Sequence, residues 1–206
     1  LLGAELSWLN DNEKRTQIEL GITSLMKRKN LTIADKDLIC SLDLKMSQIS
    51  LQQLNLDGLY KNAFYLSSLG CLNANSLPVL EELSRVILKG ERQVAFEASL
   101  ILGRKNIFND EIKKNLMLAL KRPEVANAAT YPIGKFIQLS DTVWMNELLT
   151  YLEDEKLGPD IAYLLAKLKP KSQEIQLKLV YALKKEALGN SASYALRECR
   201  PKSKTV

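Results

Sequence analysis

Apolar residues recur every three or four positions along most of the chain, with polar residues between them. In one segment they fall at Leu80, Leu83 and Ile87, and the same spacing returns at Ile112 and Leu116. This period places the apolar side chains on one face of a helix. Strand-like alternation is scarce, and Gly and Pro signals follow one another at short intervals. We therefore expect an all-α protein whose successive helices are joined by short loops and lie antiparallel.

The chain also repeats itself. Residues 94–105 align with residues 125–136 at an offset of 31, and residues 158–170 align with residues 189–201 at the same offset. An offset near 33 joins the two sets. Each aligned segment follows an amphipathic one, which predicts four helical hairpins within residues 76–200.

A single hairpin cannot bury its own apolar face, but several hairpins stacked in register can. Ala98, Ala129 and Ala162 occupy one repeat position, where a small side chain lets neighbouring helices approach. Residues 1–75 are less regular and are expected to form two divergent hairpins, with Thr32 and Asp35 capping a helix over residues 34–46. Residues 201–206 form a basic tail, and the whole chain is expected to be one continuous domain.

The repeat has a recognisable pattern, LxxAL(K)xPxVxxxAxxxxG(K). It is carried here by Leu116, Ala119, Leu120, Pro123, Val125, Ala129, Gly134 and Lys135. This pattern resembles HEAT repeats, in particular the short class described in phycobilisome lyases. The resemblance implies a right-handed α-solenoid of stacked antiparallel hairpins, of the HEAT or armadillo type. The third and fourth hairpins depart from the pattern, because Lys167 and Glu198 stand at the glycine position.

Pro132 and the glycines interrupt the helical pattern. Pro132 stands at the repeat position of Ile101, Leu165 and Leu196, so we expect a buried site inside a helix. Because proline has no N–H, the helix is expected to bend there and to open a local groove beside Tyr131. The glycines are expected at helix ends, where a positive φ closes a helix.

Composition excludes several kinds of chemistry. The chain has no histidine, which removes Ser/His and Cys/His catalytic pairs and histidine metal sites. Its three cysteines are widely spaced, without a CxxC motif, and we expect reduced, mostly buried thiols. No phosphate-binding loop or dinucleotide fingerprint occurs. The acidic run 153–155 is expected on a solvated surface. We therefore predict no cofactor, no metal site and no catalytic residue.

Positive charge is concentrated in the second half of the chain. Residues 101–206 hold 18 Lys and Arg against 12 Asp and Glu, whereas residues 1–100 hold 11 against 12. Several cations are expected at the C-terminal ends of successive second helices of the hairpins, namely Arg104, Lys105, Lys135, Lys167, Lys169, Arg197 and Arg200. Two explanations fit this placement: cations complement the helix dipole, and an aligned ridge of cations meets an acidic surface or phosphates.

Tyrosines add a second candidate. Tyr163 and Tyr194 share one repeat position, and Tyr131 lies in the preceding second helix. Second helices of such arrays commonly line the concave surface, so these rings are expected either to anchor a partner or to fill the space between repeats.

The resemblance implies an interaction role more readily than an activity, since proteins with this pattern are mostly scaffolds. We predict a non-catalytic module that binds a protein with an acidic surface through its concave face and basic ridge. The alternative is a nucleic-acid-binding protein of the alkyl-purine DNA glycosylase type, and chromophore lyases and lipid handling are further possibilities. No membrane span is expected, and the oligomeric state is left open. A cytoplasmic location is expected, with a removed export signal as the alternative.

Overall fold

The computed structural model describes residues 11–28, 30–41, 50–72, 76–105, 107–136, 142–170 and 172–199. In these residues the chain is helical and contains no strand, which confirms the all-α prediction. The first part holds α1 (Asp11–Met26), α2 (Ile33–Ser41), the short 3-10 helix η1 (Leu51–Gln53), α3 (Leu56–Lys61) and α4 (Ala63–Cys71). The second part holds α5 (Leu77–Lys89), α6 (Arg92–Leu102), α7 (Asp110–Leu120), α8 (Ala126–Phe136), α9 (Thr142–Tyr151), α10 (Gly158–Leu168), α11 (Gln173–Ala182) and α12 (Gly189–Cys199).

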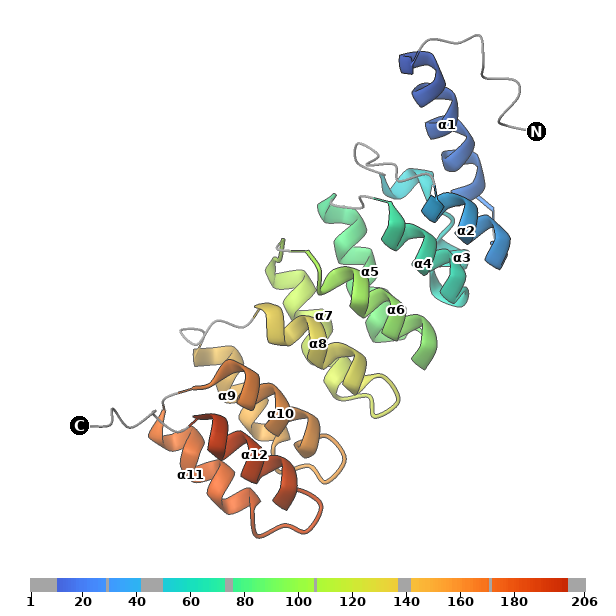
Figure 1. The fold of residues 1–206 in the computed structure, drawn as a ribbon. Helices are drawn as coiled ribbons and strands as arrows, with labels where there is room; N and C mark the ends of the chain where they lie inside the picture. The colour runs from blue at the N-terminus through green and yellow to red at the C-terminus, as the bar shows by residue number, and fades with distance from the viewer. Residues whose placement is uncertain are drawn as a thin grey trace.

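The helices are arranged in two rows. In one row, α2, α4, α6, α8, α10 and α12 each pack on the next, and we call these the second-row helices. In the other row, α3 packs on α5 and α5 on α7, with α9 and α11 continuing beyond them (Figure 1). Pairs such as α5 with α6 and α11 with α12 join the two rows, and α1 lies at the opposite end of the array from α11 and α12 (Figure 1).

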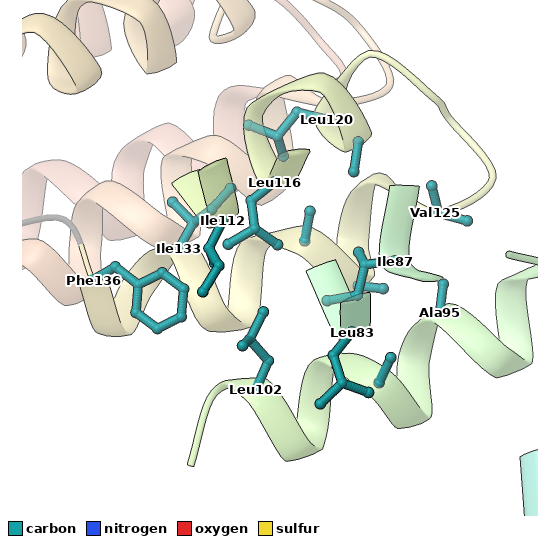
Figure 2. Packing of buried hydrophobic residues seen from close by; sticks show 14 of the residues in the cluster. Leu83, Ile87, Ala95, Leu102, Ile112, Leu116, Leu120, Val125, Ile133 and Phe136 are labelled. Carbon is teal, nitrogen blue, oxygen red and sulfur yellow. The ribbon is translucent and has the colours of Figure 1, made fainter. Parts of the chain in front are cut away.

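The core runs between the rows as a continuous band of apolar side chains. Leu83 of α5 and Leu116 of α7 stand 33 residues apart and are both fully buried. Their side chains point into the same space as Leu102, Ile112 and Ile133 (Figure 2). Each such residue contributes roughly 1.5–3 kcal/mol by burial. The repeated apolar stripe is therefore what holds one pair of helices against the next.

Side-chain caps define several helix starts. The Asn55, Asn62 and Asn109 side chains accept hydrogen bonds from backbone N–H groups in the first turns of α3, α4 and α7. Before α2, the Thr32 hydroxyl accepts from the Asp35 N–H at 3.2 Å, and the Asp35 carboxylate accepts from the Thr32 N–H at 2.9 Å. The predicted cap of Thr32 with Asp35 is confirmed. These bonds satisfy N–H groups that have no partner within their own helix.

Small residues allow close packing along the second row. Ala98, Ala129 and Ala162 are all fully buried, as their shared repeat position predicted. Gly103 has a different role from the predicted one. The described glycines all have negative φ, and a Cβ at Gly103 would lie 2.3 Å from the Tyr131 ring. Gly103 is therefore needed for close approach of α8, and the expectation of a helix-closing positive φ was wrong.

The only positive φ among the described non-glycine residues belongs to Lys169, at 49°. Lys169 ends α10 in the left-handed conformation, and its N–H donates to the Leu165 carbonyl. Pro170 follows directly and cannot continue the helix. A lysine thus adopts the helix-closing conformation for which glycine was expected.

Pro132 lies inside α8, which runs from Ala126 to Phe136. Its ring is buried, as its repeat position predicted. The bend expected at Pro132 stays a prediction.

One expectation about the cysteines was wrong. Cys40 of α2 and Cys71 of α4 form a disulfide across a sequence separation of 31. Cys199 is the buried free thiol that was expected. The two bonded cysteines are one repeat apart, so consecutive second-row helices bring them together. The disulfide therefore links α2 to α4, the first two of the second-row helices.

Polar contacts also tie α1 to the array. The buried Tyr65 hydroxyl donates to the Met26 carbonyl at the end of α1 and accepts the Asn55 N–H at 2.8 Å. Burial raises the pKa of Tyr65 to about 12. The proposed boundaries at residues 75 and 200 stay predictions, and residues 201–206 lie outside the described part.

Candidate binding face

The predicted cations lie at one end of consecutive second-row helices. Arg104 and Lys105 follow α6, Lys135 and Lys167 lie in the last turns of α8 and α10, and Arg197 lies in the last turn of α12. All except Lys105, which is half-buried, are exposed. Since α6, α8, α10 and α12 pack in this order, the cations follow one edge of the array. Arg200 lies outside the described residues.

Most of the cations along this edge have no acidic side chain as a partner. Among the described residues, no carboxylate lies within ion-pair distance of Arg104, Lys105, Lys135 or Lys167. Burial, together with the positive charge of Arg104, lowers the pKa of Lys105. Arg104 and Lys105 therefore repel each other, and an anion bound beside them would relieve this repulsion.

The end of the edge at α10 and α12 is different because an acid lies between the cations of these two helices. Glu198 is 2.9 Å from the Lys169 ammonium and 3.8 Å from the Arg197 guanidinium. The Glu198 carboxylate raises the pKa of Lys169 through this hydrogen bond. Because Glu198 offsets part of the positive charge at α12, an anion is attracted more strongly to the stretch from Arg104 to Lys167.

Two tyrosines lie on α10 and α12, the helices that carry Lys167 and Arg197. The Tyr163 and Tyr194 ring centroids are 5.5 Å apart at an interplanar angle of 49°, and the rings join α10 to α12. Tyr163 is 49% exposed and Tyr194 is 38% exposed, so the contact covers only part of each side chain. The Arg197 guanidinium lies 5.2 Å from the Tyr194 ring centroid. The pair both fills the space between repeats and offers an aromatic surface.

Tyr131 is less available than this pair. It is half-buried, and its ring covers Gly103. Its main role is to pack α8 against α6. Sequence reasoning missed two exposed aromatics on neighbouring second-row helices, Phe64 at 44% and Phe96 at 49%. Phe64 lies outside the aligned segments, so the repeat pattern did not predict that its side chain is exposed on a second-row helix.

The other polar clusters are occupied by internal contacts. The Tyr60 hydroxyl donates to Glu82 at 2.6 Å, Arg85 donates to the same carboxylate at 2.9 Å, and Arg85 also reaches Glu111 at 3.4 Å. Burial is the largest cause that raises the pKa of Tyr60 above its ordinary value, and the bond to Glu82 adds to it. This network links α3, α5 and α7.

The acidic run 153–155 lies in the turn between α9 and α10 and is exposed, as expected of a solvated segment. The Asp154 carboxylate accepts the N–H groups of Leu157 and Lys156, and these bonds lower its pKa. Within the described ranges, no group of three or more metal-ligating side chains gathers. None of the described helices is both long and apolar enough to cross a membrane.

Comparisons with models of known protein families, with characterised proteins and with solved structures each returned no significant match. The resemblance to HEAT repeats therefore stays a prediction from the sequence pattern.

Proposed function

We propose that this chain is a non-catalytic protein-interaction module built as a right-handed α-solenoid of HEAT-like hairpins. The proposal is supported by the consecutive packing of the second-row helices and by the apolar positions that recur about 33 residues apart. Arrays of this kind offer long surfaces to a partner rather than one enclosed pocket.

The observation that carries the proposal is the row of exposed cations along successive second-row helices. Arg104, Lys135 and Lys167 are exposed and lack acidic partners among the described residues. Dipole complementarity alone accounts for a cation at each helix end. The proposal adds a use for the parts of the Tyr163 and Tyr194 rings that stay exposed on α10 and α12. The partner is a protein with an acidic surface, whose apolar side chains lie on the tyrosine pair.

We infer the location from the disulfide. A bond between Cys40 and Cys71 persists in an oxidising compartment and is rare in the cytosol. We therefore favour an oxidising compartment over the cytoplasmic location expected from the sequence.

Charge reversal tests whether the edge formed by the cations Arg104, Lys105, Lys135, Lys167 and Arg197 binds the partner; we call it the binding edge. Substitution of Arg104, Lys135 and Arg197 together by Glu should reduce recovery of the partner from an extract of the native source to background, as measured by quantitative mass spectrometry. The matched control reverses Lys89, Lys114 and Lys121, which are exposed on or next to α5 and α7. It has the same net charge and should recover the partner as the wild type does. Equal recovery by both triple variants would remove the edge as the binding site.

The nucleic-acid alternative is tested with the same proteins. A random-sequence DNA duplex bound through its backbone should dissociate steeply as salt rises. Undetectable binding at low salt eliminates this alternative. If the wild type and the control variant bind the duplex in a salt-sensitive way and the edge variant does not bind it, the partner is nucleic acid and not a protein.

A further inference from the structure

The outer side of α11 carries a group of exposed apolar residues. Leu177 is 52% exposed, Val180 44%, Tyr181 65% and Leu183 41%. At the repeat offset of 31 that relates Gly158 to Gly189, Val180 corresponds to Leu149 of α9, and Leu183, just after α11, corresponds to Leu152, just after α9. Those two leucines are each 1% exposed. Positions that the array buries in α9 are therefore open in α11.

The open positions lie beside a groove between α9 and α11. The groove has a cavity of about 210 Å³, and Leu149, Leu152 and Ala182 form its apolar floor. Tyr181 forms part of its wall. α5 packs closely on α7, whereas in the described residues α9 and α11 are not closely packed on each other. A large apolar side chain from outside can enter this space.

Lysines and one glutamate, Glu153, lie at the edge of the groove. Lys178 and Lys185 line it, and the Lys184 ammonium lies 5.4 Å from the Tyr181 ring centroid. In the part of the chain that the structure describes, none of the three has a carboxylate within ion-pair distance. The Lys185 ammonium donates to the Glu153 carbonyl at 2.7 Å, which holds it at the edge of the groove. The groove thus has an apolar floor, and its edge carries Lys178 and Lys185 against one carboxylate, Glu153.

We propose that this groove binds an acidic amphipathic helix of a partner protein. α11 has ten residues, so its exposed stripe is about 15 Å long, which matches about three turns of a second helix. Apolar side chains at three- and four-residue spacing enter the groove, and flanking carboxylates meet Lys178 and Lys185. The recessed floor favours a helix over a membrane surface, because a membrane surface reaches only the outermost side chains. The site lies on α9 and α11, apart from the proposed binding edge, and does not depend on it.

Synthetic helical peptides test the proposal. One peptide carries a leucine stripe flanked by Glu, and its counterpart carries the same stripe flanked by Lys. Fluorescence anisotropy should show binding of the acidic peptide to the full chain and none of the basic one. The Lys178→Glu, Lys185→Glu double variant should bind the acidic peptide roughly tenfold more weakly, from the loss of two exposed ion pairs and the added repulsion. Tyr181→Ser should also weaken binding.

The matched control is the Lys114→Glu, Lys121→Glu variant, which has the same net charge and should bind as the wild type does. All five substituted side chains are exposed or half-buried, so circular dichroism should show unchanged helix content. Equal binding of the two peptides, or an equal affinity of both double variants, would overturn the proposal. So would binding to anionic phosphatidylserine vesicles in preference to the acidic peptide. Self-association that Tyr181→Ser abolishes would show that a second copy of the chain occupies the groove instead.

Discussion

Replacing both bonded cysteines, Cys40→Ser with Cys71→Ser, removes the one covalent link between the first two second-row helices. The link closes a loop of 31 residues. For a loop of this length, the chain-entropy relation gives about 3.7 kcal/mol of stabilisation at about 25 °C. α2 packs on α4 but buries only one side chain of its own, Ile39, so the disulfide adds to a small apolar contact. The double variant should therefore lose several kcal/mol of local stability at this end of the array.

Urea unfolding followed by circular dichroism measures the effect, and hydrogen exchange locates it. With a slope of about 2 kcal/mol/M, the midpoint of the N-terminal part should fall by about 2 M. Since helical arrays unfold by neighbouring units, exchange should accelerate in α2 and α4 and stay unchanged in α10 and α12. The wild type treated with reductant should reproduce the variant, and reductant should leave the variant itself unchanged.

Thiol titration supplies an independent check. The denatured, unreduced protein should show one reactive thiol, from Cys199, whereas a chain without the bond would show three. Three thiols in protein purified without reductant, or an unfolding midpoint that both substitutions leave in place, would refute the assignment and the stabilisation derived from it.

Three further changes probe packing, pH dependence and capping. Gly103→Ala should cost about 1–3 kcal/mol by urea unfolding, because its Cβ would meet the Tyr131 ring at 2.3 Å, and Tyr131→Ser should recover part of that loss. Tyr65 has its pKa raised to about 12, so the stability it contributes is complete below pH about 10 and is lost as pH rises towards 12. In alkaline unfolding series, Tyr65→Phe should lessen that decline; an identical slope would contradict it. Hydrogen bonds from Thr32 lower the pKa of Asp35, so its contribution is present above the ordinary carboxylate pKa and is lost as pH falls through the lowered value. Asp35→Asn should cost about 0.5–2 kcal/mol at neutral pH and nothing in strong acid, and equal costs at both would argue against the cap.

The helices and their core positions could be predicted from the sequence because one period governs both. Leu83 and Leu116 face the core for the same reason that they recur in the pattern. Ala98 and Ala129 are likewise buried at the repeat position where the sequence places small side chains. Local spacing determines such positions, and spacing can be read from one sequence.

What could not be predicted depends on pairing across the array. Cys40 and Cys71 are separated by one repeat, and that spacing was the available signal for their bond; it is visible only once the repeat extends into the irregular first part of the chain. The need for Gly103 likewise depends on where the Tyr131 ring falls, which composition does not reveal. The groove between α9 and α11 arises because two helices of the same row are spaced apart, and no local pattern encodes that spacing.

The links between helix pairs have a mechanical consequence. Asn115 bonds to Ser84 across 31 residues, Lys185 to the Glu153 carbonyl across 32, and the Cys199 thiol to the Leu165 carbonyl across 34. Each link therefore joins one helix pair to the next along the chain. A force applied between the two ends passes through every interface in series, so small rotations at each interface add up over the length of the array. The molecule should respond to tension as a soft spring whose stiffest element is the disulfide-linked end.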